Sequence, residues 1–223
     1  MPPRGLDPTG IILLDKPAGP SSFTLVSDTR RRTGAKTGHA GTLDPFATGL
    51  LVLLSGRATK LASRFVGLDK RYLTEIDLTS RTTTGDPEGE TIDVHVPPTA
   101  GELAPRLLEL TGEIELPIPA ASAVKIDGER AYKLHRRGVA VEMPLRRSTV
   151  YELTLVDYSE GVATVDLRVS SGTYVRAIAD ALGGHCRSLR RLAVGPFSVD
   201  EADPLTVIPA ADALVRLATA VSS

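Results

Sequence analysis

The sequence is short of the residues that mark several protein classes. Its 223 residues include one cysteine, Cys186, and no tryptophan. A lone cysteine cannot form an internal disulfide, so we expect a reducing compartment, the cytoplasm, rather than secretion. No apolar run approaches the ~20 residues that a membrane-spanning helix needs. The first apolar run stops at Asp15 and Lys16, so the N-terminus shows no signal-peptide core, and we expect no membrane partner.

The sequence also lacks the strong positive charge typical of many nucleic-acid binders, since its formal net charge is −1. The charges are nevertheless unevenly distributed. Residues 21–75 carry nine Lys/Arg against four Asp/Glu, and residues 121–150 carry seven against three. Residues 81–120, between them, carry eight acids and two bases. Such runs are most often solvated surfaces, but this distribution also permits a basic face.

Motifs for nucleotide, metal or redox cofactors are missing. The sequence contains neither a P-loop nor a G-x-G-x-x-G fingerprint. Its four histidines, at positions 39, 95, 135 and 185, show no metal-ligand spacing. We therefore expect no metal and no cofactor. With 42% hydrophobic and 24% charged residues, the composition suits a globular protein of one larger or two small domains.

The stretch from Gly38 to Gly49 has the sequence Gly-His-Ala-Gly-Thr-Leu-Asp-Pro-Phe-Ala-Thr-Gly. Its glycines and proline predict a loop with one carboxylate, Asp44. The apolar run Leu50–Leu54 that follows predicts a buried strand. Functional side chains often occupy such anchored loops. The alternative is a plain turn in which Asp44 bonds only nearby backbone N–H groups.

This stretch resembles the signature of the TruB family, the tRNA pseudouridine-55 synthases. The resemblance implies that Asp44 is the catalytic nucleophile and that His39 lies against the target region of the RNA. The segment Lys70-Arg71-Tyr72 matches a second family motif. By that match, Tyr72 stacks on the target base and is a candidate base for the sugar proton.

Three further segments resemble family motifs. In Gly172-Thr173-Tyr174-Val175-Arg176, the arginine is expected to pair with the catalytic aspartate and Tyr174 to line the uridine pocket. In Ser188–Leu192, Leu189 is expected to contact the substrate. Lys16–Ser22 resembles the first motif, which is more structural than catalytic, and Lys16 is also a candidate RNA contact. Val169 stands where many relatives have a cysteine, but that residue is not the nucleophile.

The run Ser122–Gly138 also resembles the family and is rich in cations. We expect four of these cations to line an RNA path: Lys125, Lys133, Arg136 and Arg137. A solvated helix face is the alternative explanation for them.

The fold implied by the resemblance is the α/β pseudouridine-synthase fold, of α+β type, with a mixed, mostly antiparallel sheet flanked by helices. Residue patterns agree, predicting strands at 10–14, 50–54, 71–79, 90–96, 147–157 and 162–169. They predict helices at 22–32 with Ser22 as N-cap, 57–66, 99–111, 129–137 and 173–183 with Thr173 as cap. We expect a catalytic domain over residues 1–200. Residues 201–223 are expected to form a short C-terminal extension of strand and helix, without a complete PUA domain.

The expected function is isomerisation of uridine to pseudouridine in the T-loop of tRNA, at position 55. The base must flip out of the stack, Asp44 is the nucleophile, and its attack at C1′ or at uracil C6 stays open. The expected partner is the T-arm stem-loop of tRNA and the expected state is a monomer. Assistance with tRNA folding is expected as a secondary activity.

Two functions of other classes remain. A glycoside or N-ribosyl hydrolase would need a second carboxylate, for which Asp180 is the nearest candidate, on the far side of its helix turn from Arg176. A non-catalytic RNA-binding module would not need a carboxylate such as Asp44 facing phosphate-rich RNA.

Overall fold

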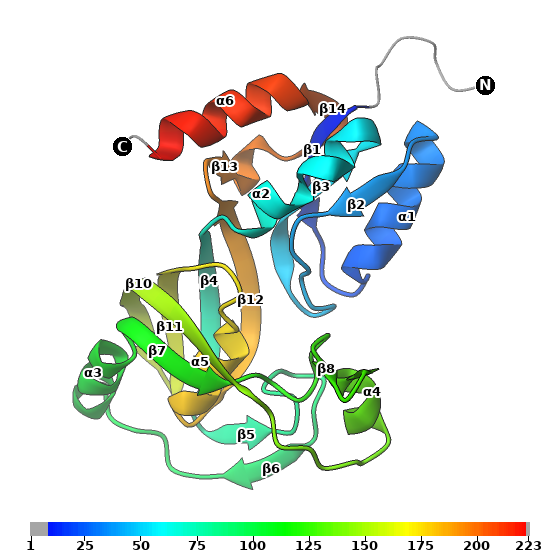
Figure 1. Ribbon diagram of the computed structural model, residues 1–223. Helices are drawn as coiled ribbons and strands as arrows, with labels where there is room; N and C mark the ends of the chain where they lie inside the picture. Colours follow the sequence, from blue (N-terminus) through cyan, green and yellow to red (C-terminus); the bar gives the residue numbers. More distant parts are fainter. Residues whose placement is uncertain (1–8, 222–223) are drawn as a thin grey trace. The chain divides into compact units, whose positions relative to one another are not determined.

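The computed structural model of the protein describes residues 9–221, and the chain divides into two compact units (Figure 1). Unit 1 comprises residues 1–73 and 189–223, and unit 2 comprises residues 74–188. The chain passes from unit 1 to unit 2 within β4 (Lys70–Asp77) and returns within β12 (His185–Val194).

The strands of unit 1 follow the order β14-β1-β3-β12, with β2 paired to β3 and β13 paired to β12. β12 runs parallel to β3, whereas β1 is antiparallel to β3 and β14, β2 to β3, and β13 to β12. Figure 1 shows α1 beside β2 and β3. The elements are β1 (Gly10–Lys16), α1 (Ser22–Thr33), β2 (Thr37–His39), β3 (Thr48–Ser55), the 3₁₀ helix η1 (Gly56–Leu61), α2 (Ala62–Val66), β13 (Phe197–Ser198), the 3₁₀ helix η2 (Val199–Glu201), β14 (Asp203–Pro209) and α6 (Ala210–Val221).

The apolar run Leu50–Leu54 is buried on both of its faces. Its first, third and fifth residues pack with Phe65 of α2 and Phe197 of β13, whereas its second and fourth pack with Val26 of α1. A strand covered on both faces has no solvent side, which explains the continuous hydrophobic run. Because β3 begins at Thr48, this strand anchors one end of the loop that carries Asp44.

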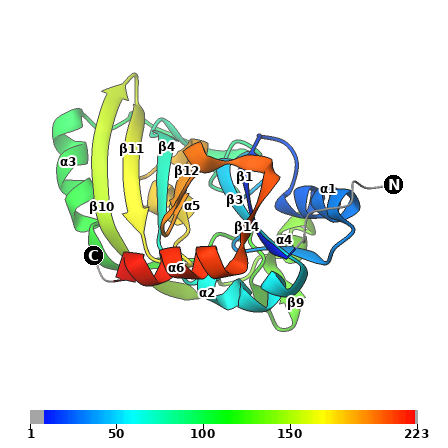
Figure 2. The ribbon, with the colours of Figure 1, turned by 90° about the horizontal axis from the view of Figure 1, so that it is seen from above.

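The strands of unit 2 follow the order β12-β4-β11-β10-β7. Buried and half-buried residues alternate along β11, as in a strand with one face on a core. Figure 2 shows α3 lying alongside β10. The elements are β5 (Ser80–Thr82), β6 (Thr91–Val94), α3 (Ala100–Glu109), β7 (Gly112–Pro117), β8 (Lys125–Ile126), β9 (Glu129–Arg130), α4 (Ala131–Arg136), β10 (Leu145–Ser159), β11 (Val162–Val169) and α5 (Val175–Ala181).

The mixed, mostly antiparallel sheet with helices confirms the predicted fold class, but two helix caps were wrong. The N-cap of α1 is Ser21, whose Oγ accepts a hydrogen bond from the Thr24 N–H at 3.1 Å. The N-cap of α5 is Tyr174, while the Thr173 hydroxyl donates to the Ser170 carbonyl instead. The Ser22 hydroxyl is bonded to Leu43 instead, and the Tyr174 side chain makes no capping hydrogen bond.

The C-terminal strand and helix are present as predicted. Strand β14 pairs antiparallel with β1, and α6 follows it directly. The predicted helix at 57–66 begins as the 3₁₀ turn η1 and becomes α-helical at Ala62. None of the helices within residues 9–221 is both long and apolar enough to cross a bilayer.

Candidate functional site

The loop that carries Asp44 is held from inside unit 1 by Lys16. Lys16 is fully buried, and its Nζ donates hydrogen bonds to the carbonyl oxygens of Pro17 at 2.9 Å, Pro45 at 3.0 Å and Ala47 at 2.7 Å. These bonds fix the backbone on both sides of Phe46, because a buried ammonium must keep its acceptors. They also correct the expectation that Lys16 contacts RNA, since none of its side chain reaches the surface.

Arg191 on β12 fixes the other end of the same loop. It is 1% exposed, and its Nε donates to the Leu50 carbonyl at 2.7 Å. Its two Nη atoms donate to the carbonyls of Gly41 at 3.1 Å and Thr42 at 3.4 Å. Its backbone pairs with Gly49, the second residue of β3. One residue therefore joins the start of the loop to its end, a task that suits the planar five-donor guanidinium.

The start of α1 provides a third attachment. The Ser22 hydroxyl accepts the Leu43 N–H and donates to the Leu43 carbonyl, both at 2.9 Å. The Gly19 N–H donates to the Pro45 carbonyl at 2.8 Å. The half-buried Asp44 thus lies between two residues whose backbones are bonded to the segment before α1 and to its first turn.

His39 lies on β2, at the entrance to the loop, and pairs with Leu53 of β3. Burial lowers the pKa of its imidazole, and the positive charge of Arg191 lowers it further. Within residues 9–221, its buried Nδ1 has no hydrogen-bond partner. The lowered pKa favours the neutral form of the imidazole.

Tyr72 and Leu189 are both buried in unit 1, at 8% and 7% exposure. Buried residues alternate with more exposed ones along β4, and Tyr72 lies on the buried face. Lys70 shares that face, and its ammonium donates to the carbonyls of Val66 and Leu68. Burial, followed by the charge of Arg191, lowers the pKa of Lys70 to about 8.

Arg176 lies in the first turn of α5, in unit 2, and is 4% exposed. It forms an ion pair with Asp86 at 3.3 Å and donates to the carbonyls of Thr84 at 2.6 Å and Ala121 at 3.0 Å. It also lines a pocket of about 230 Å³ with the turn at 82–85 and residues 117–120. Tyr174, its neighbour, is half-buried at the N-cap of α5.

The four cations predicted to line an RNA path lie at or near the surface of β8, α4 and the residue after it. Lys125, Lys133, Arg136 and Arg137 are all exposed. The Arg136 guanidinium lies over the Tyr132 ring, and Arg137 pairs with Glu129 at 2.8 Å. Arg136 and Arg137 thus each have a partner on the protein surface, an aromatic ring for the first and a carboxylate for the second.

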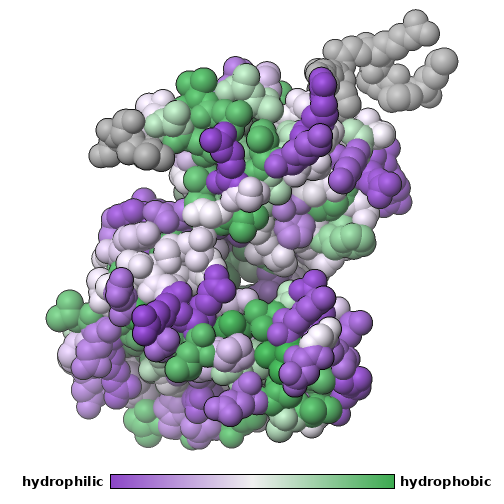
Figure 3. All heavy atoms as spheres, in the orientation of Figure 1, coloured by the Kyte–Doolittle hydropathy of each residue, from purple (hydrophilic) through white to green (hydrophobic). Residues whose placement is uncertain are grey.

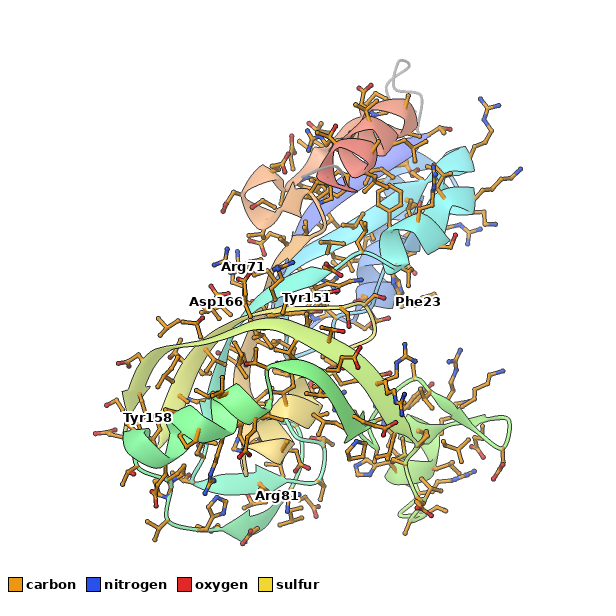
Figure 4. The ribbon with its side chains drawn as sticks, turned by 60° about the vertical axis from the view of Figure 1, so that its left-hand side comes forward. Phe23, Arg71, Arg81, Tyr151, Tyr158 and Asp166 are labelled. Atoms are coloured by element: carbon orange, nitrogen blue, oxygen red, sulfur yellow. The ribbon has the colours of Figure 1, made fainter. Side chains whose placement is uncertain are left out.

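Asp180, the carboxylate considered for a hydrolase, is engaged by Arg81. The Arg81 Nη2 and Nε atoms donate to one Asp180 oxygen at 2.7 Å and 3.0 Å. Arg81 appears in Figure 4 on the strand β5. This pair gives Asp180 a partner within unit 2.

The sequence analysis missed two supporting residues, Arg191 and Asp86. Arg191 bonds to the loop of Asp44, and Asp86 pairs with Arg176. Arg191 belongs to the matched segment Ser188–Leu192, where only Leu189 was singled out. Asp86 was not among the predicted site residues, yet its side chain is 5% exposed and accepts the Thr84 hydroxyl at 2.6 Å and the Glu88 N–H at 3.0 Å. In the sequence, Asp86 precedes Pro87, a pair that favours a turn. This pair does not show that a distant arginine is the partner of the carboxylate.

Comparison with known sequences places this geometry in context. Residues 30–175 match the sequence model described as "TruB family pseudouridylate synthase (N terminal domain)". The tRNA pseudouridine synthase B of Leifsonia xyli is 41% identical over 98% of the chain and 78% of the relative. That of Nocardia farcinica is 43% identical over 93% of the chain and 72% of the relative.

Solved structures show the same likeness. The chain superposes on a crystal structure of a Cbf5-Nop10-Gar1 complex with a TM-score of 0.67 and 27% identity. That match covers 87% of this chain but 51% of the other, so the chain spans about half the length of that solved protein. A crystal structure titled pseudouridylate synthase has a TM-score of 0.52 at 18% identity, which is likeness of fold alone.

Proposed function

Because this chain belongs to the TruB family of pseudouridylate synthases, we propose that it isomerises uridine to pseudouridine in the T-loop of tRNA, at position 55. The names of its relatives support tRNA as the substrate. The observation that carries the proposal is the anchored Asp44 loop, whose carbonyls are bonded to Lys16 and Arg191 on either side of the carboxylate. A preorganised nucleophile needs such support.

The reaction breaks the N1–C1′ bond of uridine, turns the base and joins C5 to C1′, with loss of the C5 proton. Asp44 supplies the nucleophile, at C1′ or at uracil C6. All atoms of the product come from the substrate except the exchanged proton, so the chemistry needs no cofactor.

The target base must leave the stack, which costs a few kcal/mol. We assign Tyr72 to stack on the flipped base and to act as the candidate base for the sugar proton. His39, whose lowered pKa favours the neutral imidazole, fills the vacated space in the RNA. Tyr174 and Leu189 shape the uridine pocket.

Arg176 is the cation assigned to offset the charge of Asp44. Its ion pair with Asp86 and its bonds to the Thr84 and Ala121 carbonyls support this role, because they hold the guanidinium in one orientation. Asp86 is then a positioning residue that acts through Arg176.

The T-arm is the proposed contact of the cations on β8 and α4, and recognition of its loop relies on shape and splayed bases. The names of the relatives support tRNA as the partner. We propose that the protein acts in the cytoplasm and as a monomer. By binding tRNA, the protein also assists tRNA folding as a secondary activity. An Asp44→Asn variant that fails to speed refolding of tRNA would contradict that secondary activity, because binding alone should suffice for it.

Release of tritium from a T-arm stem-loop labelled at uridine C5 tests the reaction. We expect release by the wild-type protein, none by Asp44→Asn, and no free uracil. Free uracil would instead identify a hydrolase. Binding of the RNA without any release would identify a non-catalytic RNA-binding module.

A further inference from the structure

Phe23 presents an open aromatic ring at the start of α1. Its exposed fraction is 73%, well above the 40% of Tyr151, the next aromatic residue on the surface. Figure 4 shows its side chain at the beginning of the helix, and Figure 3 shows a hydrophobic patch at that end of α1. In a chain with 4% aromatic residues, few rings are available for contacts outside the protein.

The ring belongs to the segment that is bonded to the Asp44 loop. Ser22 exchanges two hydrogen bonds with Leu43, and Phe23 and Asp44 each follow one of these residues. Each is thus a single Cα–Cα step of about 3.8 Å from that bonded pair. Phe23 therefore belongs to the segment that is bonded directly to the loop of the proposed nucleophile.

The face of the ring is also uncovered, unlike the rings that pack against another ring or an arginine. Within residues 9–221 it has neither an aromatic neighbour nor a cation over its face. By contrast, three other rings each have an arginine guanidinium within about 6 Å of the ring centroid. They are Tyr132 with Arg136 at 5.7 Å, Tyr151 with Arg168 at 4.6 Å, and Phe197 with Arg216 at 5.6 Å.

We propose that Phe23 stacks on a splayed nucleobase beside the target uridine, an inference that rests on the proposed function. Proteins that recognise RNA loops stack unpaired bases on aromatic side chains. The α1 first turn carries no carboxylate that would repel the RNA backbone. The phenylalanine side chain offers no hydrogen-bond donor or acceptor. The contact therefore favours any base that has left the stack and does not distinguish one base from another.

Variants of Phe23 and abasic RNAs test this contact together. Phe23→Ala and Phe23→Leu remove the aromatic face, and the leucine keeps apolar bulk, whereas Phe23→Trp keeps a stacking face. Each is measured for Kd and kcat/KM on the T-arm stem-loop, and on stem-loops with an abasic nucleotide 5′ or 3′ of the target uridine. We expect Phe23→Ala and Phe23→Leu to bind the intact RNA about 10-fold more weakly than the wild type and Phe23→Trp to bind it normally. One of the two abasic RNAs should erase the difference between wild type and Phe23→Ala.

Several results would overturn the inference. These are normal binding by Phe23→Leu, no loss in Phe23→Ala, or an equal loss on every abasic RNA. Because the ring is largely exposed, all variants should keep the wild-type melting temperature, so lost binding is not lost folding. Wild-type protein that turns over none of the RNAs contradicts the proposed function and the inference with it, whereas active wild type with an equally active Phe23→Ala contradicts the inference alone.

Discussion

At the scale of single residues, loss of the ion pair between Arg176 and Asp86 should lower the stability of the fold most. Both side chains are about 95% buried, with 4% and 5% exposed. Asp86→Asn removes the negative charge that faces the guanidinium, and we expect a stability loss of about 3 kcal/mol and a lower kcat. Urea unfolding and single-turnover tritium release measure the two effects.

Asp180→Asn is the matched control, because it removes a carboxylate from an arginine on the surface of the same unit. The Arg81–Asp180 side chains are 39% and 40% exposed. Solvent screens such a pair, so we expect a change within about 1 kcal/mol and unchanged turnover. Equal losses of stability in Asp86→Asn and Asp180→Asn would show that burial does not make the Arg176 ion pair more stabilising than the Arg81 pair.

Lys70 predicts a pH dependence of stability. Its folded pKa is about 8, below the ordinary 10.5, because the ammonium is buried. Between these pH values the unfolded state binds more protons than the folded state, so this group makes stability rise with pH from about 8 to about 10.5. Below pH 8 its destabilising effect is fully present.

The difference between wild type and Lys70→Met isolates this group from other titrations. We expect the rise in the urea midpoint between pH 7.5 and pH 10 to be smaller in Lys70→Met than in the wild type. Parallel profiles for the two proteins would contradict a depressed pKa for Lys70.

At the scale of elements, the approach of β12 to the start of β3 requires a glycine. Gly49 has a φ of 98°, and a Cβ there would lie 2.7 Å from the Arg191 nitrogen and 2.9 Å from its carbonyl carbon. Both contacts are with backbone, which cannot move aside cheaply. We expect Gly49→Ala to lose on the order of 3 kcal/mol or more, together with the loop geometry.

Gly38→Ala is the control from the same motif. A Cβ at Gly38 would meet nothing within 4 Å, and its φ is not positive. We expect a change within about 1 kcal/mol. Thermal melting compares the two variants, and a Gly38→Ala protein as unstable as Gly49→Ala would mean that loss of glycine itself, rather than strand approach, is harmful.

Elements with local signals were predictable from the sequence. The Thr99–Glu102 capping box of α3 is present, and Gly34 ends α1 in a left-handed conformation. The contacts that support the Asp44 loop are not local. The Lys16 bond to Ala47 spans 31 residues and the Arg191 bond to Leu50 spans 141, so no short pattern announces them.

Those long-range contacts explain the specific errors. Lys16 was expected to meet RNA, yet the fold buries its side chain and brings three carbonyls to it. Ser22 was expected to cap α1, but the loop uses its hydroxyl and Ser21 takes the cap. Side chains used by distant segments are the ones that local rules misplace.

At the scale of the whole molecule, the salt dependence of tRNA binding tests the cations of β8 and α4. Each lost phosphate contact lowers the slope of log K against log salt by about 0.7 to 0.9. We expect replacement of Lys125, Lys133 and Arg136 by glutamine to reduce that slope by about 2. The matched control replaces three other exposed cations by glutamine, Arg106, Arg147 and Arg187, and should keep the wild-type slope.

The most direct test of the central claim is to map the modified position in full-length tRNA. Carbodiimide labelling of pseudouridine, followed by reverse transcription, reports each modified nucleotide as a stop. After reaction with the wild-type protein we predict one new stop, at position 55 of the T-loop, and none after reaction with Asp44→Asn. A stop elsewhere, no stop at all, or an equal stop with Asp44→Asn would contradict the account of a T-loop isomerase that uses Asp44.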